Sequence, residues 1–391
     1  MEAVARAPTL APDVAAVIGV APGTAELMGR DDTESLWDVS LLGRRLREHR
    51  AHISAAPTTS FIDIVEAATP RRRPAKEPMS QPGTIEPGKL FLDQNGAVAQ
   101  LHGIGIQRFD GLFWAWGEDK TNGALFTGVA CYSSPDLATW TFHGHALAAD
   151  PEIADLGPDR IIERPKVMRN PAGTYVMLLH VESPDYSYAR VGWAVADRPE
   201  GPYTYLRSER PMGNISRDIG VFIDDDATGY LMSEDREHGL HIYRLSPDYL
   251  AIDELVATTL TPPSDHPAGP HGYESPTMLK ADGTYYLFGS ELTGWSTNDN
   301  QYATAPSPAG PWGQWRDFAP VGSATFDSQT SVVLPIVGTE TTSYVYLGDR
   351  WRSKDLFNSP PVWLPLHIAD GEACLEWRDS WALDAVTGAI S

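Results

Sequence analysis

Five polar residues recur along this chain, each eight to eleven residues before a tight turn with a nearby aromatic residue. In chain order they are His102, Glu163, Asp218, Glu274 and Gln329, and the last four lie 55, 56 and 55 residues apart. Three of these side chains are carboxyls, which cost free energy to bury unless another group pairs with them. Carboxyls held close together also separate in pKa, so that one stays protonated while the others ionise. The set is therefore suited to general acid–base chemistry.

Cleavage of a glycosidic bond needs such a set, because one group protonates the departing oxygen while another handles the attacking water. A single polar residue at the start of a strand more often caps that strand or forms an ion pair, here with Arg164, Arg190 or Arg217. Four such residues in register favour the catalytic interpretation. Aromatic rings that stack on sugars would fit the same site, and Trp295 is the best candidate because it lies in a polar loop at 293–296.

Short strands are the elements that would carry these residues. From residue 90 onward, strands alternate with Gly, Pro, Asp and Asn turns, and long helical patterns are absent. Hairpin turns recur at intervals near 55 to 62 residues, which is typical of propeller blades with several strands each. The sequence therefore predicts an all-β, five-bladed β-propeller over residues 89–391. Equivalent positions on its inner strands would converge at one end of the central channel. A β-sandwich does not account for the regular recurrence.

Residues 1–88 have a different composition and are predicted to form an extension that is partly helical or disordered. Residues 34–49 place leucine and valine at helical spacing, and 60–68 could form a second short helix. A stretch rich in proline, arginine and glycine then runs to Gly88 and is predicted to be a linker.

Composition excludes several classes of partner. The chain has 391 residues and a formal net charge of −22, which argues against binding to nucleic acid or to an anionic membrane. No apolar run is long enough to span a bilayer. No signal peptide is evident, so the chain is cytoplasmic as it stands, or secreted if its true start differs. Cys131 and Cys374 have no metal-ligand spacing and are expected to be two buried free thiols. We expect neither a metal site nor a cofactor.

Nine short segments between residues 90 and 385 give the chain a family resemblance. They are 162–167 (IERPKV), 185–192 (DYSYARVG), 216–218 (SRD), 240–245 (LHIYRL), 274–276 (ESP), 293–295 (TGW), 326–329 (FDSQ), 348–351 (GDRW) and 362–366 (VWLPL). Together they resemble glycoside hydrolase family 43, and most closely its exo-β-1,3-galactanase subfamily. The resemblance implies an exo-acting, inverting hydrolase that releases galactose from β-1,3-galactan, the main chain of arabinogalactan.

The resemblance also implies roles for individual residues. Glu274 matches the general acid, and Asp218 matches the carboxylate that orients this acid and tunes its pKa. Glu163 matches a residue that holds hydroxyls of the terminal galactose. Gln329 stands where the subfamily is proposed to use a glutamine, as its imidic-acid tautomer, to position or activate water. Further contacts with the sugar are implied for Glu118, Tyr186 and Thr293.

The sequence departs from the family pattern in places that bear on specificity. Most members have an aspartate base on the first inner strand, but that strand here begins with His102 and has no carboxylate, as in the galactanase subfamily. Glu291 and Leu292 replace the usual Gly-Cys, and the loop at 233–236 lacks an expected asparagine. Two alternatives stay open: a family-43-like arabinofuranosidase or xylosidase, against which the missing aspartate argues, and a sugar-binding propeller without catalysis.

Overall fold

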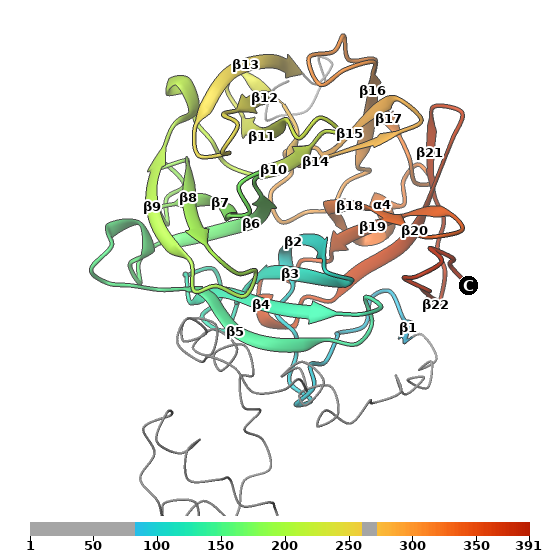
Figure 1. The fold of residues 1–391 in the computed structure, drawn as a ribbon, viewed down its shortest axis with the longest axis horizontal. Coiled ribbons are helices and arrows are strands. Elements are labelled where there is room, and N and C mark those ends of the chain that lie inside the picture. The colour runs from blue at the N-terminus through green and yellow to red at the C-terminus, as the bar shows by residue number, and fades with distance from the viewer. Residues whose placement is uncertain (1–82, 260–271) are drawn as a thin grey trace, which may run out of the picture. The chain divides into compact units, whose positions relative to one another are not determined.

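The structure is a computed structural model that describes residues 83–259 and 272–391. The described residues form five four-stranded antiparallel sheets, each built from four consecutive strands. Figure 1 shows the sheets around a common centre, with one strand of each sheet innermost. The all-β, five-bladed propeller predicted from the sequence is thereby confirmed. The helices expected at 34–49 and 60–68 lie outside the described residues.

Each blade runs from an inner strand to an outer strand. Blade 1 contains β2 (His102–Phe109), β3 (Leu112–Glu118), β4 (Gly128–Ser134) and β5 (Thr141–Ala148). Blade 2 contains β6 (Ile161–Arg169), β7 (Tyr175–Glu182), β8 (Arg190–Ala196) and β9 (Thr204–Glu209). Blade 3 contains β10 (Ile219–Ile223), β11 (Gly229–Asp235), β12 (Gly239–Leu245) and β13 (Ile252–Thr259). Blade 4 contains β14 (Glu274–Ala281), β15 (Thr284–Ser290), β16 (Gln301–Ala305) and β17 (Arg316–Asp317). Blade 5 contains β18 (Gln329–Val337), β19 (Thr342–Asp349), β20 (Pro361–Ala369) and β21 (Glu372–Leu375).

Within the described residues, four short helical turns lie between or beside the strands of the blades. They are η2 (Ala154–Leu156), η3 (Pro211–Gly213), α4 (Ala324–Asp327) and η4 (Leu356–Asn358). The α4 turn is left-handed, because all four of its residues have φ between 50° and 59°. It directly precedes the start of β18.

Apolar clusters between neighbouring blades form the core. The middle strands β4 and β7 are buried along their whole length, because a neighbouring blade covers each face. The five inner strands contact one another in order around the channel, and β18 contacts β2 to complete the ring. A small extra sheet joins β1 (Thr84–Ile85) to β22 (Trp381–Ala382). Ile85 is fully buried beside Trp140 and Trp363, although residues 84–85 lie within the stretch assigned to the linker.

The inner strands of blades 1, 2 and 4 share a local distortion. In each strand a β-bulge follows the first site residue, and the next residue has a positive φ: 55° at Gly103, 52° at Arg164 and 54° at Ser275. A bulge turns the adjacent side chain away from the regular alternation of the strand. Gly103 also has a steric reason, since a Cβ there would lie 1.8 Å from Oε1 of Glu118.

The two cysteines differ in exposure. Both are free thiols, and Cys131 is buried between blades as expected. Cys374 is exposed, so the prediction of two buried thiols was wrong for this residue. It lies on the outermost strand of blade 5, where alternate side chains face solvent. Among residues 83–259 and 272–391, no helix is long and apolar enough to cross a membrane.

Candidate active site

The inner strands converge on a cavity of about 240 Å³. Seven of the nine residues singled out from the sequence line it: Glu118, Glu163, Tyr186, Asp218, Glu274, Trp295 and Gln329. Its other lining residues are Arg164, His180, Arg217, Glu234, Arg236, Gly294 and Trp351. All five blades therefore contribute polar side chains to one site.

Glu274 is the carboxyl singled out from the sequence whose surroundings favour the protonated form, and burial also raises the pKa of Glu234 in the same cavity. Burial raises its pKa well above the usual range, and the nearby carboxyls of Asp218 and Glu234 raise it further. Nε2 of Gln329 donates a 2.9 Å hydrogen bond to its Oε1. A buried glutamate that keeps its proton at neutral pH is suited to act as a general acid.

Asp218 is held in the opposite state. Burial alone would raise its pKa, but the positive charges of Arg164 and His180 outweigh burial and lower the pKa. Nη2 of Arg164 lies 3.2 Å from Oδ2 of Asp218. The same oxygen accepts the backbone N–H of Ser275 at 3.0 Å, and Ser275 directly follows Glu274. Asp218 is thus an anion that is hydrogen bonded to the strand that carries the proton donor.

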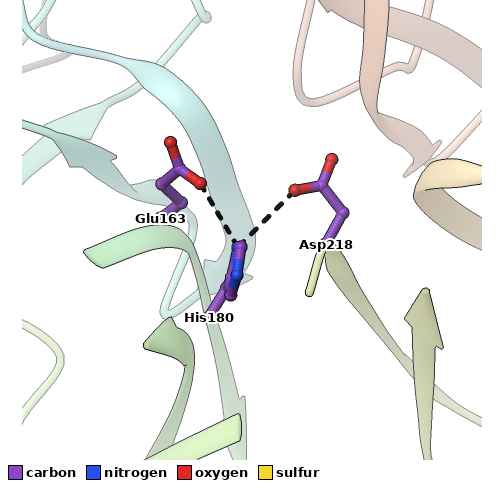
Figure 2. A group of neighbouring side chains, drawn as sticks. All are labelled: Glu163, His180 and Asp218. Atoms are coloured by element: carbon purple, nitrogen blue, oxygen red, sulfur yellow. Dashed lines mark ion pairs between the residues drawn. The ribbon is translucent and has the colours of Figure 1, made fainter. Parts of the chain in front are cut away.

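His180 lies between two carboxylates from different blades, as Figure 2 shows. Its Nδ1 is 3.3 Å from Oε2 of Glu163 and 3.7 Å from Oδ1 of Asp218. Its Nε2 is 3.5 Å from Oε2 of Glu182. Burial would lower the pKa of this imidazole, but the carboxylates of Asp218, Glu163 and Glu182 raise it well above its usual value.

The ligand atoms of Glu163, His180 and Asp218 lie within 4.8 Å of one another, close enough for a metal ion. Two cations already neutralise these carboxylates. Arg164 lies 3.2 Å from Asp218, and Nζ of Lys120 lies 3.9 Å from Glu163. The charges therefore fit an imidazolium that joins Glu163 and Asp218 better than they fit a divalent ion.

Blades 1 and 2 form a wall of fixed anions. Glu118 is buried with its Oε2 2.5 Å from Nζ of Lys120, and its Oε1 accepts the backbone N–H of Arg164 at 2.9 Å. Burial would raise the pKa of Glu118, but Lys120 and Arg164 lower it. The hydroxyl of Tyr186 donates to Oε1 of Glu163 at 3.1 Å. This wall offers carboxylate oxygens that can accept hydrogen bonds from sugar hydroxyls.

Gln329 lies in blade 5, next to the proton donor. Its Oε1 accepts hydrogen bonds from Nη2 of Arg164 at 2.5 Å and from Nε1 of Trp351 at 2.8 Å. Its Nε2 donates to Glu274 and, at 3.2 Å, to Oγ of Ser290. The amide therefore faces the acid with its nitrogen, and Arg164 and Trp351 with its oxygen.

Two residues singled out from the sequence do not line the cavity. Oγ1 of Thr293 donates to the carbonyl of Ser296 within its own loop, while Trp295 from the same loop is 46% exposed at the rim. The rings of Trp295 and Trp351 meet edge to face, with centroids 5.7 Å apart. His102 is buried, and burial lowers its pKa to about 4, so its ring is neutral.

Sequence reasoning missed a second ring of polar residues on the second strands of the blades. These residues are Glu118, His180, Glu234, Ser290 and Asp349, of which only Glu118 had been assigned to the site. Four of them pair in register with His102, Glu163, Glu274 and Gln329. Their recurrence at the blade interval, near the ends of predicted strands, was a usable signal.

Comparisons with known proteins identify the family of this chain. The family model for glycosyl hydrolases family 43 matches residues 120–335, more than half of the chain. The solved structure of a "putative exo-beta-1,3-galactanase" from Bifidobacterium bifidum s17 is 50% identical, with a TM-score of 0.72. The match covers 75% of this chain and 97% of that one. A variant of the exo-β-1,3-galactanase of Phanerochaete chrysosporium, solved with β-1,3-galactotriose, is 35% identical with a TM-score of 0.72, over 79% of this chain and 70% of that one.

A curated relative, a β-D-galactofuranosidase from Aspergillus niger, is 29% identical over 52% of this chain. The match spans 60% of that relative's length. The family match, the propeller and the paired carboxyls agree, and the chain belongs to glycoside hydrolase family 43.

Proposed function

We propose that this protein is an exo-acting, inverting hydrolase that releases galactose from the non-reducing end of β-1,3-galactan. The observation that carries the proposal is the pair formed by Glu274 and Asp218. One buried carboxyl has a raised pKa and its neighbour a lowered pKa. A propeller that only bound sugar would not need this difference in ionisation.

In the proposed reaction, Glu274 donates its proton to the departing glycosidic oxygen as the bond to the anomeric carbon breaks. Asp218 stays ionised, which keeps the proton on Glu274 until the leaving oxygen takes it. A water molecule attacks the anomeric carbon from the opposite face, which inverts its configuration. We assign Gln329 to position this water, which must displace one of the amide's four protein partners, and the proton that the water loses passes to solvent.

Two features support the substrate class. The small cavity with its wall of Glu118, Glu163 and Tyr186 suits one terminal sugar whose hydroxyls donate to fixed carboxylates. Two relatives with 50% and 35% identity are described as exo-β-1,3-galactanases, the first as a putative one, and the second was solved with a β-1,3-linked trisaccharide. Trp295 and Trp351 at the rim would contact the next sugars of the chain.

The test is product analysis on β-1,3-galactan. Wild-type protein should release galactose from chain ends, and NMR of the first product should show the anomer of inverted configuration. Glu274→Gln should lower the rate by roughly 10²- to 10⁴-fold, the usual contribution of a general acid. Galactose binding should persist in this variant, because an amide of the same shape remains. Equal rates in the two proteins would remove Glu274 from the acid role.

A second candidate function comes from the curated relatives, a β-D-galactofuranosidase and a non-reducing-end α-L-arabinofuranosidase from Bacteroides ovatus. Both names imply a five-membered sugar ring at the cleaved end. Aryl glycosides of β-galactopyranose, β-galactofuranose and α-arabinofuranose separate the candidates directly. Turnover confined to the furanosides would replace the galactan proposal while leaving the role of Glu274 intact.

A further inference from the structure

The side-chain amide of Gln329 is fully hydrogen bonded. A carbonyl oxygen accepts two hydrogen bonds and an NH₂ group donates two. Here Oε1 accepts from Arg164 and Trp351, while Nε2 donates to Glu274 and Ser290. A flipped amide would point its N–H groups at two donors. The partners of Oε1 therefore determine which end of the amide faces the acid.

Arg164 is the charged member of that pair. Its side chain is buried, and the same Nη2 that donates to Gln329 lies 3.2 Å from Asp218. Its Nη1 donates to Oγ of Ser331 at 2.8 Å. Its backbone is fixed by the bulge and by the hydrogen bond from its N–H to Glu118. Contacts with Asp218 and Ser331, together with the fixed backbone, therefore hold the guanidinium in place independently of Gln329.

We propose that Arg164 is the positioning residue for Gln329. With the Trp351 indole it fixes the amide oxygen, and it thereby directs Nε2 toward Oε1 of Glu274. Because the carbonyl oxygen of a carboxylic acid is the stronger acceptor, this hydrogen bond to Oε1 favours the acidic proton of Glu274 on Oε2. Neither Arg164 nor Trp351 needs to touch the reacting atoms. The inference rests on the proposed function in one respect only: hydrolysis of β-1,3-galactan is the reaction whose rate is measured.

Arg164→Lys is the informative substitution, because lysine keeps the positive charge beside Asp218 but lacks the planar fork that serves several acceptors. We expect kcat to fall by about 10²-fold, as for a misplaced group near the reacting centre. KM should stay within about threefold, since the sugar-binding wall is unchanged. The limbs of the pH–rate profile should stay in place, because the charge near Asp218 and Glu274 is retained.

A double-mutant cycle distinguishes positioning from general damage. If Arg164 acts through Gln329, adding Arg164→Lys to Gln329→Ala should lower kcat by less than about threefold. The matched control is Arg217→Lys, in the same cavity, whose guanidinium donates to the carbonyl of Tyr186 at 2.6 Å. Its effect should be the same with and without Gln329. An equal loss from Arg164→Lys in both backgrounds would overturn the proposal.

A measurement without substrate separates this inference from the proposed function. The side-chain NH₂ of Gln329, assigned by its absence in Gln329→Ala, should exchange slowly with solvent in wild type and at least tenfold faster in Arg164→Lys. Unchanged exchange rejects the role of Arg164, whatever the substrate is. If exchange is faster in Arg164→Lys but the wild-type protein releases no galactose, the galactan substrate is rejected and the positioning role of Arg164 is retained.

If Arg164→Lys does not fold, Trp351→Phe takes its place. This change removes one N–H donor to Oε1 of Gln329 and keeps an aromatic ring near Arg164, whose guanidinium lies 5.7 Å from the Trp351 ring centre. We expect amide exchange to accelerate and kcat to fall by about tenfold. Slow amide exchange together with an unchanged kcat would mean that Arg164 and Trp351 do not jointly hold the amide of Gln329.

Discussion

The two sides of the cavity hold the same residue type in opposite states. On the side of blades 1 and 2, Glu118 lies 2.5 Å from the ammonium of Lys120, and its pKa is lowered. On the side of blades 3 and 4, the carboxyls of Asp218 and Glu234 affect the pKa of Glu274 more than Arg164 and Arg236 do, and with burial they raise it. Among the described residues, no basic group lies within ion-pair distance of Glu274. The partner of each glutamate, more than its burial, decides whether it binds a hydroxyl or donates a proton.

The largest test of this contrast is Glu118→Gln. The substitution leaves the buried ammonium of Lys120 without its closest counter-charge, and breaking a buried ion pair typically costs about 3–5 kcal/mol of unfolding free energy. Urea unfolding at pH 7 measures the loss. The double variant with Lys120→Met should recover part of it. A loss below about 1 kcal/mol would mean that the ion pair with Lys120 does not stabilise Glu118 in its ionised form.

Glu274→Gln provides the matched comparison for stability. A carboxyl with a raised pKa in the folded state keeps a proton that the unfolded chain releases, so it lowers stability as pH rises above the unfolded value. The amide removes this cost, and the variant should be at least as stable as wild type at pH 7.

Asp218→Asn should have the next largest effect, about 10²-fold in kcat. Glu274 acts while protonated, so activity is present below its folded pKa and lost as pH rises through it. Removing the negative charge of Asp218 lowers that pKa. The alkaline limb of kcat/KM should therefore move to lower pH. A limb that stays in place would show that Asp218 does not tune the acid.

Tyr186→Phe is a smaller test on the side of blades 1 and 2. It removes one hydrogen bond to Glu163, worth about 1 kcal/mol, and should raise KM by roughly fivefold with little change in kcat. Steady-state kinetics on a galactan oligosaccharide give the two constants. A fall confined to kcat would place Tyr186 with the reacting groups.

Trp295→Ala should have the smallest effect. The ring is 46% exposed at the rim, so unfolding free energy should change by less than about 0.5 kcal/mol. KM should rise severalfold for a trisaccharide and stay near wild type for an aryl galactoside that occupies only the cavity. Equal changes for both substrates would move Trp295 into the terminal sugar site.

The blade repeat made much of the site predictable. Side chains one blade apart must meet at the channel, so Glu163, Asp218, Glu274 and Gln329 could be assigned to one cavity from spacing alone. The hairpin turns gave the same register independently.

Other features depend on contacts that spacing does not encode. The positive φ of Arg164 and Ser275 follows from β-bulges, and no turn residue in the sequence marks the position of these bulges. The blade interval could have placed His180 at the channel, but one imidazole in a buried strand gives no sign of the three carboxylates that surround it. The orientation of the Gln329 amide needs donors from blade 2 and from the loop after β19 at once.

The small sheet between β1 and β22 has a consequence for the order of synthesis. Thr84 and Ile85 leave the ribosome before all twenty blade strands, yet their partners Trp381 and Ala382 follow all of them. Blades 1 to 4 can assemble from neighbouring segments as they emerge. The buried place of Ile85 beside Trp363 is completed only after blade 5 has been made. A nascent chain therefore carries an open ring until blade 5 has been made, and β1 can pair only after Trp381 and Ala382 have followed.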